Sequence, residues 1–283
     1  MSEPILMLPA FRSGRETPWA GDMLHRKYEK YALGNLIGES YDLSLLSDHE
    51  STAPDGTPLS ECVKTSELPF MIRWLDAKSP MSIHVHPHHD EHLIVTDTGA
   101  EARIVAGLQA HVAIDDLEDL LANSPPEDVF HFVSVHPGDV ISIPAGVPHS
   151  LMDITCYQIQ APLTDSFRLY DWDRTNARGQ KRPLQFEKAV SCLTKKTASC
   201  TASQDSRVIH AYAFDVFRFC DQSNIKYQLI QPFSVLTFLA PGQITLETGK
   251  KLYLCAGQTV FIPGDSIPFS LTGAHFVLAV PCV

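Results

Sequence analysis

The stretch HPGDVISIPAGVPHSL, residues 136–151, occurs twice in the chain in altered form. Its second copy is CAGQTVFIPGDSIPFSL, residues 255–271, which has one inserted residue. In both copies a glycine opens a turn, a strand-like apolar run leads to Ile-Pro, and a loop ends in Pro, one variable residue and Ser-Leu. A supersecondary unit that recurs in each half of a chain indicates two related domains. We therefore expect two similar β-barrels.

Short apolar runs separated by proline and glycine surround both copies, as expected for a β-rich chain. FMIRWLDA, SIHVHP and ARIVAGL precede the first copy, whereas VLTFLA, KLYLCA and HFVLAV belong to the second half. Helical spacing of apolar residues predicts one helix in AIDDLEDLLANSPP, ended by Pro125 and Pro126. A second helix is expected over 21–31. We predict a mainly β fold of two barrels, with a few short helices inserted in the first.

The division between the barrels is expected at 193–206, LTKKTASCTASQDS, which is small and polar and resembles a linker. We accordingly predict a first domain over 1–192, with an N-terminal extension and a helical insert, and a second domain over 207–283.

Composition limits the classes of partner. The 283 residues carry a net charge of −11, which makes nucleic acid and anionic membranes unfavourable partners. The sequence shows neither a signal peptide nor a long apolar span, and its seven cysteines form no CxxC pair. We therefore expect a cytoplasmic protein whose partner is a small molecule. The sequence leaves the oligomeric state open.

A concentration of imidazole and carboxylate precedes the first copy of the repeat, in SIHVHPHHDEHLIV, residues 82–95. Residues i and i+2 of a strand point to the same face, so His84 and His86 share a face. Glu91 follows after a turn, and His149 comes from the repeated motif. These residues form a three-histidine, one-carboxylate set suited to Zn²⁺, or to Fe²⁺, Mn²⁺ or Ni²⁺. We predict a metal site with the ligands His84, His86, Glu91 and His149. All four lie in 1–192, which we therefore expect to be the metal-binding catalytic domain, whereas the second domain, 207–283, is expected to lack metal ligands.

The other polar residues of this stretch are expected to lie in a solvated turn. They are His88, His89, Asp90 and His92. Position 149 of the first copy corresponds to Phe269 of the second, so the second barrel has an apolar ring where the first has an imidazole. We expect Phe269 to be a core residue.

The glycine-led repeat resembles the second motif of the cupin family, whose fold is a small double-sheet jelly roll. Nearly the whole chain further resembles type I mannose-6-phosphate isomerases in their short bacterial form. The resemblance rests on PAFRSGRETPWAGDML (9–24), GESYDLS (38–44), LPFMIRWLDAKSPMSIHVHP (68–87), the first repeat copy and SFRLYDWDRTNARGQKRPLQFEKAV (166–190). It implies a metal-dependent isomerase that interconverts mannose 6-phosphate and fructose 6-phosphate through an enediol.

The resemblance also implies roles for individual residues. Arg168 matches the family's active-site arginine, and we expect it to be catalytic. The residues expected to bind substrate are Arg73, Lys78, Tyr170 and Asp171.

The chain departs from the family pattern at several positions. The long insert before the ligand glutamate is missing, His84 replaces a Gln or Lys, Arg73 replaces a Lys and Gln158 replaces a Glu. Two alternatives therefore accompany the isomerase: a non-catalytic cupin that binds a sugar or metabolite, and an isomerase of another sugar phosphate. An Fe²⁺ dioxygenase on the same ligand set is a third possibility, and the motifs outside the metal site weigh against it.

Overall fold

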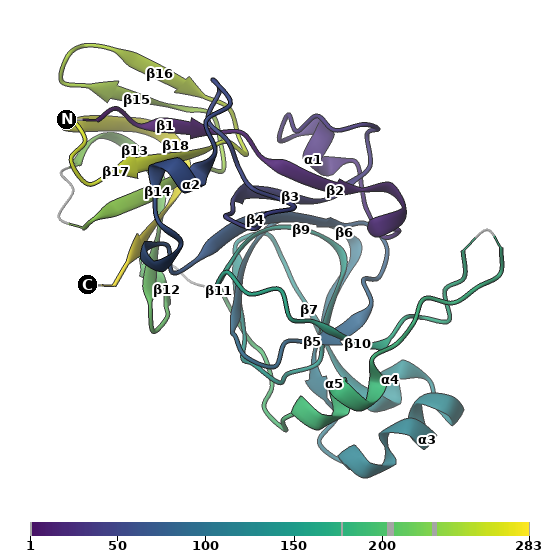
Figure 1. Ribbon diagram of the computed structural model, residues 1–283. Helices are drawn as coiled ribbons and strands as arrows, with labels where there is room; N and C mark the ends of the chain where they lie inside the picture. The colour runs from purple at the N-terminus through teal and green to yellow at the C-terminus, as the bar shows by residue number, and fades with distance from the viewer. Residues whose placement is uncertain (1, 177, 203–206, 228–230, 283) are drawn as a thin grey trace. The chain divides into compact units, whose positions relative to one another are not determined.

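The computed structural model describes residues 2–176, 178–202, 207–227 and 231–282 and is mainly β, as predicted (Figure 1). It divides into two compact units. Unit 1 comprises residues 1–18, 22–75 and 203–283, and unit 2 comprises 19–21 and 76–202.

Unit 2 is built on antiparallel strands in the order β11-β8-β6-β9, with β7 on β6, β5 on β9 and β10 on β5. The strands are β5 (Ile83–Val85), β6 (Glu91–Leu108), β7 (Phe130–Ser134), β8 (Asp139–Ile143), β9 (His149–Gln160), β10 (Phe167–Tyr170) and β11 (Ser199–Ala202). The helices are η3 (Ile114–Asp116), α3 (Leu117–Asn123), α4 (Pro126–Val129) and α5 (Phe186–Cys192). In Figure 1 the three α-helices lie together at one end of the unit.

The apolar core of unit 2 determines which face of β5 carries the side chain of His84. Ile83 and Val85 are fully buried in a cluster with Leu117, Phe130 and Leu169. Because strand residues alternate between faces, this anchorage sends the side chain of His84 to the other face of β5.

Unit 1 has one sheet in the order β1-β17-β14-β18-β13-β12, with β15 on β18 and β16 on β15, and a meander β2-β3-β4. Its N-terminal strands are β1 (Ile5–Met7), β2 (Ala10–Ser13), β3 (Ile37–Leu43) and β4 (Met71–Ala77, of which Asp76 and Ala77 fall in unit 2). The later strands are β12 (Arg207–His210), β13 (Phe214–Tyr227), β14 (Phe233–Phe238), β15 (Gly242–Leu246), β16 (Lys251–Leu254), β17 (Thr259–Pro263) and β18 (Phe269–Pro281). The short helices are η1 (Gly14–Glu16), α1 (Met23–Arg26), α2 (Leu59–Cys62) and η2 (Thr65–Glu67).

The interior of unit 1 is apolar where the repeat predicted it. Phe269 is 4% exposed and packs in a cluster with Ile244, Val260, Leu271 and Phe276. The expectation that this ring is a core residue is confirmed.

A buried charge pair lies elsewhere in unit 1. The ammonium of Lys30 lies 2.9 and 2.7 Å from the two carboxylate oxygens of Asp42, and both residues are at most 5% exposed. Lys30 also donates to the carbonyl oxygen of Gly257, and Asp42 accepts from Ser40 and Thr259. The pair therefore joins the segment that contains α1 and β3 to the turn that precedes β17.

The helices differ from expectation at one place. The helix predicted in 113–126 is present as η3 and α3, which ends at Asn123 before the two prolines, and a separate turn of helix, α4, begins at Pro126. The helix predicted over 21–31 is present only as α1, so that prediction was wrong for the rest of the range. Glu29, within that range, has φ of 51°, a left-handed backbone that a helix cannot continue through.

The compact units divide the chain differently from the predicted domains. Residues 2–18 and 22–75 group with the second half of the chain, not with 76–192. Within the predicted linker, Ser199–Ala202 forms β11 and pairs with β8, while residues 203–206 lie outside the described residues. The assignment of catalysis to 1–192 stays a prediction.

None of the helices in the described ranges is long and apolar enough to cross a membrane.

Candidate metal centre

A single row of side chains crosses three neighbouring strands of unit 2. His149, at the start of β9, pairs with His84 of β5, and His84 pairs on its other side with Arg168 of β10. Residues directly opposite each other in antiparallel strands project from the same face. Two imidazoles and a guanidinium therefore share one face, and their order is set by backbone register.

Backbone carbonyl groups orient the three imidazoles. The Nδ1 atoms of His84, His86 and His149 lie 2.9, 2.7 and 2.9 Å from the carbonyl oxygens of Ser82, Asp165 and Val147 respectively. Since a carbonyl oxygen only accepts, the proton of each neutral ring is on Nδ1 and the lone pair on Nε2. Such a second hydrogen bond is the usual way in which a protein orients a metal-binding histidine.

The carboxylate of Glu91 faces these Nε2 atoms. Its Oε1 lies 2.9 Å from Nε2 of His86 and its Oε2 lies 3.2 Å from Nε2 of His149, and Glu91 is only 3% exposed. Burial by itself would raise the pKa of Glu91, but His86 and His149 outweigh burial and keep that pKa well below its ordinary value. The carboxylate is therefore anionic at neutral pH.

The ring of His84 favours the neutral form. Burial, together with the neighbouring His149 and His86, lowers the pKa of His84 well below the ordinary value. Neutral imidazole is the form that binds metals. In the absence of a metal, an Nε2 proton on His86 or His149 is what holds the pKa of Glu91 down. When the rings are neutral and keep only the Nδ1 proton, the Nε2 lone pairs and the Glu91 oxygens are all acceptors, and a divalent cation among them would take the place of those protons. The donor set therefore fits a metal such as Zn²⁺.

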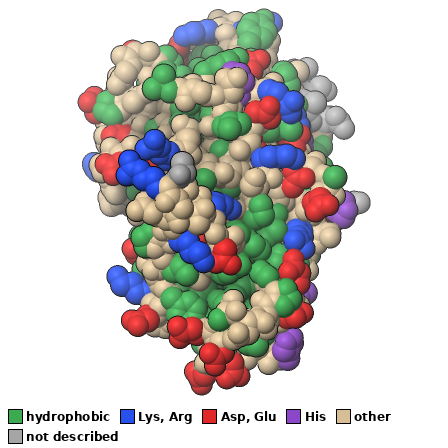
Figure 2. Space-filling view, turned by 90° about the vertical axis from the view of Figure 1, so that its right-hand side faces the viewer, with side chains coloured by type: hydrophobic (Ala, Val, Ile, Leu, Met, Phe, Trp, Pro, Cys, Tyr) green, Lys and Arg blue, Asp and Glu red, His purple; other side chains and the backbone are tan. Residues whose placement is uncertain are grey.

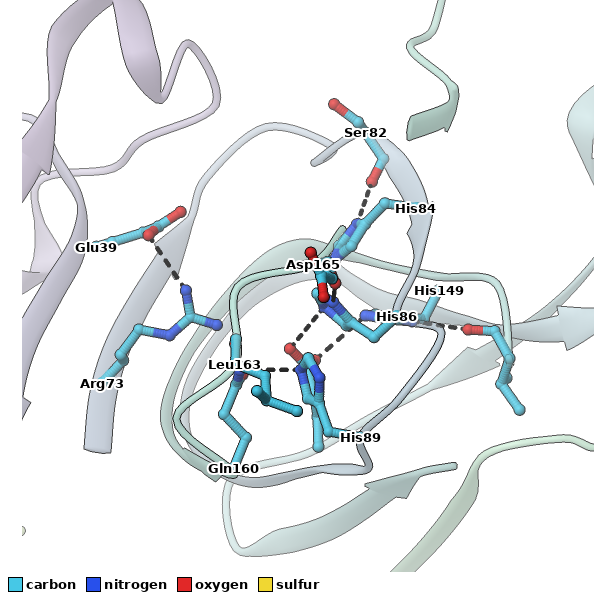
Figure 3. Close-up of polar contacts among 12 residues, drawn as sticks. Glu39, Arg73, Ser82, His84, His86, His89, His149, Gln160, Leu163 and Asp165 are labelled. Atoms are coloured by element: carbon cyan, nitrogen blue, oxygen red, sulfur yellow. Dashed lines mark hydrogen bonds and ion pairs between the residues drawn. The ribbon is translucent and has the colours of Figure 1, made fainter. Parts of the chain in front are cut away.

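The structure brings the four predicted metal ligands together. Ring centroids are 4.2 Å apart for His84 and His149, 5.0 Å for His84 and His86, and 5.2 Å for His86 and His149 (Figure 3). His84, His86 and His149 offer nitrogen atoms within 4.8 Å of one another, as do His86, His89 and Glu91 with their nitrogen and oxygen atoms.

The turn before β6 is less solvated than expected. His88 is exposed, as predicted, but the prediction was wrong for His89, which is 5% exposed. It was also wrong for His92, which lies in β6 and not in the turn, is 7% exposed and has its Nδ1 2.9 Å from the hydroxyl of Ser142. The ring of His89 lies 4.5 Å from that of His86, and Nε2 of Gln160 lies 3.0 Å from its Nε2. Asp90 is exposed, as predicted, and accepts a hydrogen bond from the backbone amide of Ala145. A turn this short draws His89 inward because both of its ends are fixed, one at His86 and the other at Glu91.

Arg168 belongs to a polar cluster that sequence reasoning only partly foresaw. Its Nε donates to the hydroxyl of Ser82 at 3.1 Å and its Nη1 donates to the carbonyl oxygen of Pro183. Asp171 accepts from the same hydroxyl at 2.9 Å and from both Nε and Nη2 of Arg182, at 2.8 and 2.5 Å. Ser82 and Arg182 were not predicted, because no spacing rule connects residues so far apart in the chain.

The remaining predicted substrate residues have other surroundings. In unit 1, Arg73 lies 3.3 Å from the carboxylate of Glu39 and stacks over the ring of Tyr41. Lys78 is 67% exposed and pairs with Asp153 at 2.6 Å. Tyr170 is half-buried, with its ring 5.4 Å from that of Trp172. Their part in substrate binding stays a prediction.

Comparison with known proteins agrees with this architecture. The family model described as Cupin matches residues 60–155. A mannose-6-phosphate isomerase of Streptococcus mutans is 24% identical over 317 residues, which cover 99% of this chain and 98% of that protein.

Two solved structures extend the comparison to the fold. The crystal structure of the mannose 6-phosphate isomerase from Bacillus subtilis superposes with a TM-score of 0.83 at 21% identity, covering 98% of this chain and 99% of that one. A mannose 6-phosphate isomerase bound with zinc and yttrium superposes with a TM-score of 0.72 at 11% identity, covering 100% of both chains. With a cupin match over residues 60–155 and mannose-6-phosphate isomerases aligned from end to end, the chain is similar in sequence and fold to these cupin-containing isomerases over nearly its whole length.

Proposed function

We propose that this protein is a metal-dependent aldose–ketose isomerase that interconverts mannose 6-phosphate and fructose 6-phosphate. The observation that carries the proposal is the row His149, His84, Arg168 on one face of three paired strands. The row puts candidate metal ligands beside a permanent cation. An isomerase needs both near the two oxygens of the substrate between which a proton moves.

The metal would be held by His84, His86, His149 and Glu91. Bound there, a divalent metal would supply Lewis-acid stabilisation of the negative charge that develops on the substrate oxygens. Because three ligands are neutral and one is anionic, the site as a whole would keep a net positive charge. That charge favours a substrate whose oxygens become anionic during the reaction.

Arg168 would add a charge that does not titrate. The guanidinium stays protonated at any working pH, so it can stabilise a developing oxyanion without a proton being lost to solvent. Asp171 accepts two hydrogen bonds from the guanidinium of Arg182, which fix the orientation of its carboxylate. A carboxylate held in this way can in turn orient the side chains beside it.

The phosphate requires cations in a chain of net charge −11. On the face in Figure 2, basic side chains lie among acidic ones, so the net charge does not make this surface uniformly acidic. The cations that the family resemblance offers for the phosphate are Arg73, Lys78, Arg168 and Arg174. Lys78 is exposed and its pair with Asp153 is a surface ion pair, which costs little to open.

The test is an assay of purified, metal-analysed protein. Fructose 6-phosphate formed from mannose 6-phosphate should appear with Zn²⁺, disappear with a chelator and return when Zn²⁺ is restored. Bound zinc without turnover of any hexose phosphate would instead indicate a non-catalytic cupin that binds a sugar or metabolite. Turnover of another sugar phosphate alone would indicate a different isomerase, and oxygen uptake with iron would indicate a dioxygenase.

A further inference from the structure

The hydroxyl of Ser82 lies where three side chains meet. It donates to Oδ1 of Asp171 at 2.9 Å and accepts from Nε of Arg168 at 3.1 Å and from Nη2 of Arg182 at 2.9 Å. A serine hydroxyl has one donor hydrogen and two acceptor lone pairs. All three are used here, so the position of the oxygen is fixed from three directions.

The same residue contacts the candidate metal centre through its backbone. The carbonyl oxygen of Ser82 accepts the hydrogen bond from Nδ1 of His84 at 2.9 Å. Ser82 therefore orients both the imidazole of His84, through its carbonyl group, and the guanidinium of Arg168, through its hydroxyl. Ser82 is only 8% exposed, so solvent competes little for these hydrogen bonds.

Asp171 and Arg182 fix the far side of this junction. The two parallel hydrogen bonds between them are a charge-assisted fork, which is strong and directional. Arg174 lies 3.9 Å from the same carboxylate and donates to the carbonyl oxygen of Pro80. Because two cations, Arg182 and Arg174, lie beside its carboxylate, Asp171 keeps one orientation, and its Oδ1 faces the hydroxyl of Ser82.

We propose that Ser82 is a positioning residue, which aims the guanidinium of Arg168 at the face that carries the metal ligands, with Asp171 and Arg182 as its anchor. The proposal rests on the isomerase function proposed above. Ser82 itself touches neither metal nor substrate, and it acts by removing the freedom of a long side chain.

The experiment compares Ser82→Ala with Ser82→Thr, which keeps a hydroxyl, and with Ser191→Ala, a matched control on the exposed side of α5. With mannose 6-phosphate, Ser82→Ala should lower kcat about 10-fold to 100-fold, the usual effect of losing a hydrogen bond to a charged group. Its KM should change far less. Ser82→Thr should recover most of kcat, and Ser191→Ala should match the unaltered protein.

Two further readouts separate positioning from a structural role. The carbonyl group of Ser82 remains in Ser82→Ala, so bound Co²⁺ should keep its stoichiometry and visible spectrum. In ¹⁵N spectra the Arg168 Nε–H signal, identified by its loss in Arg168→Lys, should exchange faster with solvent in Ser82→Ala. Unaltered kcat, an unaltered Arg168 signal, or loss of Co²⁺ binding would each overturn the proposal.

The Arg168 Nε–H signal also separates the positioning role of Ser82 from the isomerase function on which it rests. If the unaltered protein converts no hexose phosphate, the isomerase function falls, and the Arg168 signal still decides whether Ser82 holds that side chain. If Ser82→Ala does not fold, Arg182→Lys decides instead. It keeps the charge but removes the fork to Asp171, and it should lower kcat and speed exchange of the Arg168 signal in the same way.

Discussion

At the scale of single residues, the candidate metal centre depends on which ring nitrogen carries a proton. Three backbone carbonyl groups hold the Nδ1 protons of His84, His86 and His149, and so direct Nε2 of each ring into the site. Carbonyl acceptors cannot be removed by substituting the residue that supplies them. This orientation should therefore survive most side-chain changes around the site.

Replacing His149 by alanine should abolish metal binding and isomerase activity while leaving the barrel folded. His149 sits at the start of β9 and supplies one nitrogen to the site, whereas the β-sheet hydrogen bonds of β9 come from its backbone. Metal content, far-ultraviolet circular dichroism and the thermal midpoint check this. Zinc should raise the midpoint of the unaltered protein, because a ligand at about 100 times its Kd adds roughly 2.7 kcal/mol to stability. A zinc-dependent shift that persists in His149→Ala would contradict the assignment.

Replacing Phe269 by alanine should act on stability alone. The ring is buried in the core of unit 1, so its loss should cost about 3–5 kcal/mol through lost burial and the cavity left behind. Urea unfolding measures the loss. Tyr253→Ala provides the control, since that ring is 71% exposed and its removal should change stability by less than about 0.5 kcal/mol. Equal effects of the two substitutions would be incompatible with a core role for Phe269.

Single residues also show where sequence reasoning ends. His84 and His86 were predictable because a period of two on a strand puts them on one face, and His149 was predictable from the repeated motif. Ser82 and Arg182 were not, because their contacts join positions 100 residues apart. His89 was misassigned because polarity alone does not reveal that a short turn is drawn inward.

At the scale of elements, the segment from β10 to α5 is held by charge as well as by packing. Asp171 follows β10 directly and binds Arg182, which lies shortly before α5. Burial would raise the pKa of Asp171, but hydrogen bonds from Arg182 and Ser82 outweigh burial and lower that pKa. The folded protein therefore binds this proton more weakly than the unfolded chain does.

The sign of this shift predicts a pH dependence. A lowered folded pKa means that the contribution of Asp171 to stability is complete above the unfolded value, near 3.8, and is lost as pH falls through the lower folded value. The difference in unfolding free energy between the unaltered protein and Asp171→Asn should thus be constant near neutral pH and shrink in acid. Urea unfolding at several pH values measures it. Asp173→Asn, at an exposed ion pair, should show a small difference throughout. A difference for Asp171→Asn that does not change with pH would refute the assignment.

Strands were easier to predict than helices in this chain. Alternating β-branched and aromatic residues mark β4, β7 and β8, and the repeated motif marks β8 and β17. The predicted strand ARIVAGL proved to be the second half of the longer β6, which begins at Glu91 and continues through residues 99–101 with a register shift between Thr98 and Arg103. The expected helix over 21–31 shortened to α1 because Glu29 takes a left-handed backbone.

At the scale of the whole molecule, unit 1 contains residues from both ends of the sequence. β1 pairs with β17, and the ammonium of Lys30 reaches Asp42 and the carbonyl oxygen of Gly257. The repeat predicted two barrels, but it could not predict that residues 2–18 and 22–75 group with the second of them. That choice is made by pairings between residues more than 200 positions apart.

Removing half of the buried charge pair should destabilise unit 1. Asp42→Ala leaves the ammonium of Lys30 buried without its counter-charge, which should cost about 3–5 kcal/mol. The double substitution Lys30→Met with Asp42→Leu should recover much of that loss, because an apolar pair carries no desolvation penalty. Denaturant unfolding of the three proteins checks both outcomes. A double variant no more stable than Asp42→Ala would show that the pair is needed for more than charge balance.

The pairing of β1 with β17 also governs the order in which a ribosome can complete the two units. Strand β1 ends at Met7, and the strand that must flank it begins at Thr259. At a synthesis rate of roughly 5–20 residues per second, β1 lacks its partner strand β17 for on the order of ten seconds or more. Apart from residues 19–21, unit 2 is contiguous from 76 to 202, so all its strands leave the exit tunnel while unit 1 still waits for its closing strands. The nascent protein therefore spends that interval with all the strands of unit 2 available for pairing, while the incomplete unit 1 is exposed to chaperones and to neighbouring chains.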